Sequence, residues 1–296
     1  MTTPFATAST IEEALAALAA GARPVAGGTD LVVGARQGKA PLPESIVAIH
    51  RIDALRPIEE RGGGLRLPAL VTHAEIVASD AVRERFTALA DASAIVGSHA
   101  TRAQGTIGGN LMNASPAMET GGPLMCFDGT VTLRSASASR TVPVEELFRG
   151  PGATVAAPDE LLVAVELPGP PPDSGSAYVR LEYRRQMEIA VVGATAVVAL
   201  DGDEIVDARV AITALAPTIR RIRPAEHALV GTSGDAAAVA AAAAAAAGGA
   251  APISDVRASE RYRTAMAEVI SRRAIEAALE RARGRDVPIP ATGSRA

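Results

Sequence analysis

The 296-residue sequence contains one cysteine, Cys126, four histidines and no tryptophan. A single cysteine excludes an internal disulfide framework. It also excludes an iron–sulfur cluster or a structural zinc site whose cysteine ligands all come from this chain. The four histidines form no HExxH pair. We therefore expect no metal site within this chain.

Basic charge and long apolar runs are also lacking. The formal net charge is −4 and the pI is about 5.7, which gives no basic surface for nucleic acid or anionic lipid. The longest uncharged apolar stretches, 190–200 and 236–247, are shorter than the roughly 20 residues that cross a bilayer. The N-terminus has no basic region before its apolar residues. The sequence predicts a cytoplasmic protein with no nucleic-acid partner and no membrane span.

The composition suits a folded protein of two domains. Hydrophobic residues make up 48% of the chain, and 296 residues exceed the usual size of one domain. The segment 168–175 (PGPPPDSG) is too rich in proline and glycine to join a sheet centrally, so it marks a boundary. Runs of strands followed by runs of helices indicate an α+β fold. We expect domains at 1–172 and 176–285, followed by a loose tail at 286–296.

Local patterns predict the elements. Thr10 with Glu13 and Thr72 with Glu75 have capping-box spacing and predict two helix starts. One helix is expected over 80–94, an Ala-rich helix over 235–247 and a long amphipathic helix over 259–283. Strands are expected at 23–26, 45–49, 65–70, 129–133, 141–144, 161–167, 177–183, 195–200, 205–210 and 211–215.

Two glycine-rich segments stand out as candidates for ligand binding. The first, 24–31 (PVAGGTDL), reads as a strand running into a glycine turn. The second, 105–111 (GTIGGNL), belongs to a glycine-rich loop expected over 97–110. In both, backbone amides and small polar side chains can approach an anion closely. Neither is a GxxxxGK[ST] phosphate loop or a GxGxxG dinucleotide fingerprint. Each by itself fits a tight structural turn as well as a binding loop.

Taken together and in order, five segments are more specific. They are VAGGTDL (25–31), RAQGTIGGNLMNASP (102–116), LLVAVELP (161–168), YRRQMEIAVVGA (183–194) and DVRASERYR (255–263). In this combination the chain resembles the FAD-binding subunit of the molybdenum hydroxylases, the family of xanthine dehydrogenase and carbon monoxide dehydrogenase. The resemblance covers nearly the whole chain.

The resemblance implies an α+β fold with a two-lobed PCMH/VAO-type FAD-binding domain and a smaller C-terminal domain of sheet and helices. It implies FAD as the cofactor of this chain, with no catalytic acid–base residue, since the flavin performs the redox step. It also implies two kinds of partner: a small subunit carrying 2Fe–2S clusters and a large molybdopterin-binding subunit. Electrons would pass through FAD to NAD, a quinone or another acceptor.

Carried over residue by residue, the resemblance implies FAD contacts at two glycine segments and four further positions. The first segment would cradle the pyrophosphate and the second would form an opposite wall. Glu119 would lie near the adenosine part, Leu162 and Arg180 would contact FAD, and Ile189 would lie in a loop that approaches the isoalloxazine ring. The two segments comprise Val25, Ala26, Gly27, Gly28, Thr29, Asp30 and Leu31, and Thr106, Ile107, Gly108, Gly109 and Asn110.

The chain departs from the family pattern at three positions. Glu119 and Glu188 stand where many relatives have aspartate, and Gln186 stands where charged residues are common.

Two alternatives to the family role stay open. One is a self-sufficient FAD-dependent oxidase of the VAO-type fold. The other is a cofactor-free interaction subunit whose glycine segments bind nothing.

Overall fold

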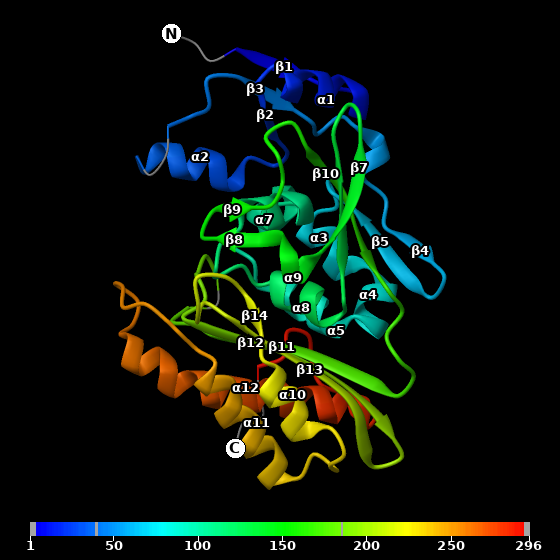
Figure 1. The fold of residues 1–296 in the computed structure, drawn as a ribbon, viewed down its shortest axis with the longest axis vertical. Coiled ribbons are helices and arrows are strands. Elements are labelled where there is room, and N and C mark those ends of the chain that lie inside the picture. Colours follow the sequence, from blue (N-terminus) through cyan, green and yellow to red (C-terminus); the bar gives the residue numbers. More distant parts are fainter. Residues whose placement is uncertain (1–3, 39–40, 185, 293–296) are drawn as a thin grey trace.

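The computed structural model describes residues 4–38, 41–184 and 186–292. The elements form three lobes stacked along the long axis, with the N-terminal lobe at the top of Figure 1. That lobe has a parallel sheet in the order β1-β3-β2, and α1 packs beside it. Its elements are β1 (Phe5–Thr7), α1 (Ile11–Ala19), β2 (Arg23–Val25), α2 (Thr29–Arg36) and β3 (Ile46–Ala48).

The middle lobe is an antiparallel sheet in the order β4-β5-β10-β6-β7, with helices packed against it (Figure 1). Its strands are β4 (Glu59–Arg61), β5 (Gly64–Pro68), β6 (Thr130–Arg134), β7 (Ser139–Pro143) and β10 (Leu161–Leu167). Its helices are α3 (His73–Ala78), α4 (Asp80–Arg85), α5 (Thr87–Ala94), α6 (His99–Gln104), α7 (Ile107–Asn113) and α8 (Gly121–Cys126). Short connecting elements are η1 (Asp53–Leu55), α9 (Val144–Leu147), β8 (Phe148–Gly150) and β9 (Ala153–Thr154).

The C-terminal lobe is an antiparallel sheet in the order β11-β12-β13-β14, and Figure 1 shows α10, α11 and α12 below it. The side chains of its strands alternate between two cores. Val197 belongs to the core of the middle lobe, whereas Val198 belongs to the core beneath the sheet. The elements are β11 (Ser174–Leu181), β12 (Val192–Asp201), β13 (Glu204–Thr213), β14 (Arg220–Arg221), α10 (Arg223–Leu229), α11 (Ala236–Gly248) and α12 (Glu260–Ala282).

The α+β prediction is confirmed, and so are both helix starts. Thr72 and Glu75 form a complete capping box at α3. Thr10 accepts from the Glu13 amide at α1, but the Glu13 carboxylate accepts from the Ser9 amide at 2.7 Å, one residue before the box position. In the C-terminal lobe, the strands expected at 205–210 and 211–215 are one continuous strand, β13.

Two local predictions in the middle lobe are wrong. The helix expected over 80–94 is split at Phe86, whose backbone leaves the helical region (φ −122°, ψ 47°). The Phe86 ring is fully buried and meets Phe127 edge-on, with ring centroids 5.0 Å apart, so tertiary packing interrupts the helix. The glycine-rich loop expected over 97–110 contains α6 and α7, because Ser98 and Thr106 cap these helices despite the glycines.

Asp91 joins the middle lobe to the C-terminal lobe. Its buried carboxylate accepts from both terminal nitrogens of Arg281 on α12, at 2.6 and 3.0 Å. It also accepts from the amides of Tyr178 on β11 and of Ala291. Within the expected tail, Ala291 is therefore hydrogen-bonded to the middle lobe through Asp91. Residues 293–296 lie outside the described residues.

Within the residues that the structure describes, no helix combines the length and the apolar character needed to cross a membrane. Nor do these residues bring three or more His, Cys, Asp or Glu side chains together in a way that could hold a metal ion. Cys126 is buried at the end of α8.

Candidate functional site

The first glycine segment forms a turn with unpaired backbone amides. The chain leaves β2, turns through Gly27 and Gly28, and enters α2. Gly28 has a φ of +70°, in the left-handed region that favours glycine. No side chain caps α2, and its first hydrogen bond runs from the Val32 amide to the Gly28 carbonyl at 3.0 Å. The amides of residues 29–31 therefore have no acceptor among the described residues, which suits them to bind an anion.

The first segment lies directly against the start of the second. A Cβ placed on Gly27 would come within 1.9 Å of the Gln104 carbonyl oxygen at the end of α6. A Cβ on Gly105 would lie 3.3 Å from His73 Cδ2 and 3.7 Å from the Thr29 hydroxyl. A side chain at Gly27 would disrupt this contact, whereas one at Gly105 would lie in ordinary contact with Thr29. The fold thus brings together two segments that are far apart in the sequence.

The second segment differs from the first because its amides are used within the protein. The N–H groups of residues 107–110 donate to the carbonyls of Val71 and Ala69 and to the carbonyl and hydroxyl of Thr106. Gly108 is buried against Ala69, whereas Gly109 is exposed. The amides of residues 29–31 therefore stay available to a ligand, whereas those of residues 107–110 are used within the protein. To the candidate site, the second segment contributes a closely packed surface and the Asn110 side chain.

Glu119 of the middle lobe and Arg180 of the C-terminal lobe form a buried ion pair. Arg180 Nη1 donates to Glu119 Oε1 at 2.6 Å, and both side chains are more than 90% buried. Arg180 also donates to Glu182, through Nε at 2.8 Å, and to the Glu188 carbonyl. Burial raises the pKa of Glu119 to about 7, although the positive charge of Arg180 favours the carboxylate. This carboxyl can therefore bind or release a proton near neutral pH.

A side-chain contact connects this pair to the second glycine segment. The Thr120 hydroxyl donates to Asn110 Oδ1 at 2.6 Å. Thr120 directly follows Glu119 and is fully buried. The expected site residues Asn110, Glu119 and Arg180 therefore belong to two contacts that are joined by the peptide bond between Glu119 and Thr120, and Thr120 is a residue that the sequence did not reveal.

Ile189 lies in a loop held against α6. The Met187 amide donates to the Gly97 carbonyl at 2.9 Å, and Arg184 donates to the Met187 carbonyl at 2.7 Å. Ile189 is 44% exposed, so the loop presents an apolar side chain at the surface. The loop is placed between α6 and the end of β11, beside the group formed by Glu119 and Arg180.

Leu162 lies on β10 where this strand passes beneath α7. The Gly108 amide donates to the Ala69 carbonyl, and the Ala69 amide donates to the Val163 carbonyl. The strand has an irregular register between Leu162 and Ala164. The Leu162 side chain is buried in the middle core, so a contact to a ligand would come from its backbone.

Sequence reasoning missed His73 and Glu182. The His73 ring is 1% exposed beside Gly105, and burial, with the charge of Arg102, lowers its pKa to about 4. The imidazole is therefore neutral at physiological pH. Glu182 shares Arg180 with Glu119. The spacing of Arg180 and Glu182 at the end of the strand expected over 177–183 was the available signal, since residues two apart in a strand share a face.

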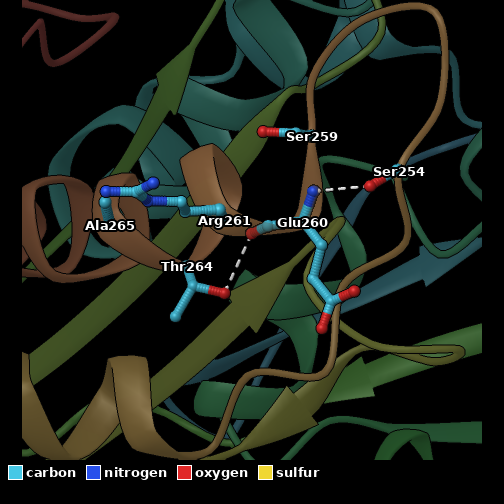
Figure 2. Close-up of a pocket in the computed structure, with 6 residues that line it drawn as sticks. All are labelled: Ser254, Ser259, Glu260, Arg261, Thr264 and Ala265. Atoms are coloured by element: carbon cyan, nitrogen blue, oxygen red, sulfur yellow. Dashed lines mark hydrogen bonds between the residues drawn. The ribbon is translucent and has the colours of Figure 1, made fainter.

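The surface pocket in Figure 2 lies elsewhere, at the start of α12, and contains none of the expected site residues. Its polar groups serve the local structure. The Glu260 amide donates to Ser254 Oγ at 2.8 Å, and the Thr264 hydroxyl donates to the Glu260 carbonyl at 3.0 Å. The lining residues are Ser254, Ser259, Glu260, Arg261, Thr264 and Ala265.

Family models match both parts of the chain. The model of the FAD binding domain in molybdopterin dehydrogenase matches residues 2–170, and that of the CO dehydrogenase flavoprotein C-terminal domain matches residues 177–278. The carbon monoxide dehydrogenase medium chain of Afipia carboxidovorans is 32% identical over 88% of this chain and 90% of its own. The putative xanthine dehydrogenase FAD-binding subunit of Escherichia coli is 27% identical over 94% of this chain and 96% of its own.

Solved structures agree with these matches. The reconstituted CO dehydrogenase from Oligotropha carboxidovorans superposes with a TM-score of 0.91 at 31% identity, covering 95% of this chain and 99% of that chain. Quinoline 2-oxidoreductase from Pseudomonas putida 86 superposes with a TM-score of 0.89 at 27% identity, covering 95% and 98%. The predicted fold class, with an FAD-binding domain followed by a CO dehydrogenase flavoprotein C-terminal domain, is confirmed. This chain belongs to the family of FAD-binding medium subunits of the molybdenum hydroxylases, and it is an oxidoreductase subunit.

Proposed function

We propose that this chain binds FAD and is the electron-transfer subunit of a cytoplasmic, molybdopterin-dependent hydroxylase. Its partners would be a small subunit with 2Fe–2S clusters and a large molybdopterin-binding subunit. When bound, FAD would supply the redox chemistry that carries electrons from the clusters to NAD, a quinone or another acceptor. The observation that carries this proposal is that the amides of residues 29–31 meet no acceptor among the described residues, directly after a turn that has no room for a side chain at Gly27.

The first segment fits a diphosphate. The amides of residues 29–31 can each donate to a phosphate oxygen, and the N-terminus of α2 adds a positive potential. The Thr29 hydroxyl, beside Gly105, can donate a further hydrogen bond. Val25 and Ala26 bring the backbone to the turn, while the exposed Asp30 is free to bind ribose hydroxyls.

The remaining proposed contacts surround this cradle. The surface of 106–110 supplies the second wall, and Glu119 accepts hydrogen bonds from the adenosine part. Arg180 orients Glu119 and places a buried positive charge beside the site. The backbone of Leu162 lies beneath the second wall, and Ile189 supplies an apolar contact to the ring. These groups bind, orient and exclude water, so none of them needs to act as an acid or base.

A pair of glycine substitutions tests the cradle. Gly27→Ala forces a Cβ into the Gln104 carbonyl, whereas the Cβ of Gly34→Ala, in the adjacent helix α2, meets no atom within 4 Å. We expect wild type and Gly34→Ala to show the flavin absorption band at about 450 nm, and Gly27→Ala to lose most of this band. Circular dichroism checks that each variant is folded. The protein should be produced both alone and together with its partner subunits.

Two results would contradict the proposal. A folded wild-type chain that takes up no FAD in either preparation would favour the cofactor-free interaction subunit. Bleaching of the flavin band by a small substrate, without any partner chain, would favour the self-sufficient oxidase. The proposed partners are tested separately, by mass spectrometry of the proteins recovered with a tagged chain from its host.

A further inference from the structure

Three hydroxyl groups meet on the face of the C-terminal sheet that is turned toward the middle lobe. Thr195 lies opposite Tyr178 across β11 and β12, and Gly193 lies opposite both Arg180 and Thr213. Because Gly193 has no side chain, the Tyr178 hydroxyl occupies the space above it. A Cβ on Gly193 would lie 2.6 Å from Tyr178 Oη and 3.1 Å from Thr213 Cβ.

The helix α8 closes the same space from the other side. A Cβ on Gly122 would lie 2.5 Å from Thr195 Oγ1 and 3.4 Å from Thr213 Oγ1. Two glycines from different lobes thus leave the space that the Tyr178 and Thr195 hydroxyls occupy. Tyr178, Thr195 and Thr213 are each 0% exposed, and none of their hydroxyl oxygens has a hydrogen-bond partner of normal geometry among the described residues. The Tyr178 and Thr213 hydroxyls are near enough to each other for Thr213 to act on the pKa of Tyr178.

This hydroxyl pocket lies beside Glu119. Glu119 comes three residues before Gly122, and Arg180 projects from the same face of β11 as Tyr178. Burial raises the pKa of Tyr178 well above its usual value, and the charge of Glu119 is the next largest cause. Tyr178 therefore stays protonated and can always donate a hydrogen bond. The other charged groups acting on Glu119 are Arg180 and Glu182.

Buried hydroxyls in native proteins are rarely left without a partner, and an internal water needs two to four polar groups. We propose that Tyr178, Thr195 and Thr213 are positioning residues that hold one internal water molecule and, through it, orient the Glu119 carboxyl beside Arg180. The role of Glu119 toward FAD rests on the proposed function, whereas the hydroxyl pocket itself does not. Donors on this side stabilise the carboxylate, so losing one makes Glu119 bind its proton more tightly.

Infrared spectroscopy can test this inference without FAD. A protonated buried carboxyl gives a separate C=O band, which is assigned to Glu119 by its loss in Glu119→Gln. Titrating the band against pH gives the midpoint for Glu119. We expect Tyr178→Phe and Thr213→Val each to raise the proton affinity of Glu119 by about three- to tenfold, the effect of one hydrogen bond. Thr213→Ser keeps the hydroxyl and should keep the wild-type midpoint.

Tyr262→Phe is the matched control, because Tyr262 is 42% exposed on α12 and should not move the midpoint. Unchanged midpoints in both Tyr178→Phe and Thr213→Val would overturn the inference. FAD titration of the same variants is the second readout. If the midpoints shift but no variant and no wild-type chain binds FAD, the pocket stands and the proposed function fails.

Discussion

Glu119 is a buried carboxyl group whose charge changes with pH near neutrality. Its ordinary pKa of 4.5 rises to about 7 because burial removes water from the carboxylate, and Arg180 offsets only part of that cost. The Glu119 carboxylate accepts from Arg180 at 2.6 Å and so makes the ion pair between the middle and C-terminal lobes.

The raised pKa fixes the sign of a stability effect. A group that binds its proton more tightly when folded stabilises the protein at low pH and loses that contribution as pH rises through the folded pKa. Between about pH 5 and pH 8, we expect wild type to lose about 2 kcal/mol of unfolding free energy relative to Glu119→Gln. Urea unfolding at several pH values measures this difference. Glu260→Gln, at an exposed position, is the control, and its unfolding free energy should change with pH as that of wild type does. The prediction would be contradicted if the unfolding free energies of Glu119→Gln and wild type changed with pH in parallel.

At the scale of elements, capping and tertiary contact decide where helices form. Polar caps at Ser98 and Thr106 start α6 and α7 in a segment whose glycines suggest a loop. The buried ring of Phe86 breaks a helix that the local pattern continues. Capping signals could be recognised from the sequence because they depend on neighbours three residues away. The break at Phe86 could not, because it depends on Phe127.

Adjacent glycines in α7 give a test at this scale. A Cβ on Gly108 would lie 2.7 Å from the Cβ of Ala69, in the middle core, whereas the nearest atom to one on the exposed Gly109 is the Thr106 hydroxyl at 3.0 Å. We expect Gly108→Ala to cost about 2 kcal/mol of stability, as overpacking does, and Gly109→Ala to cost less than about 1 kcal/mol. Denaturant unfolding of the two variants measures both costs. Equal costs would show that α7 can shift away from Ala69.

For the whole molecule, Asp91 connects parts that are distant in the sequence. Its carboxylate binds Arg281 on α12, the β11 backbone and the segment that follows α12. The pKa of Asp91 is raised because burial outweighs the effect of Arg281. One buried carboxylate thus fixes the middle lobe against the C-terminal lobe, on which Arg180 is placed.

Removing Arg281 should be costly because it leaves that carboxylate buried without its charge partner. We expect Arg281→Met to lower the unfolding free energy by about 3–5 kcal/mol. Arg283 directly follows α12 and donates to the Ser233 carbonyl at the surface. Arg283→Met removes this exposed contact and should lower the unfolding free energy by less than about 1 kcal/mol. Thermal and denaturant unfolding compare the two. If both variants lose the same small amount of unfolding free energy, the contact between Asp91 and Arg281 does not stabilise the packing of the two lobes.

The sequence by itself determined the α+β class, most strands, the capped helix starts and the two glycine segments, because these depend on short-range patterns. Only the tertiary structure decided which amides stay unpaired. Residues 107–110 donate to Val71, Ala69 and Thr106, whereas residues 29–31 meet no acceptor among the described residues. The pairing of Glu119 with Arg180 was likewise decided by packing between lobes. A local pattern specifies a turn, but the partners of its polar groups come from distant parts of the chain.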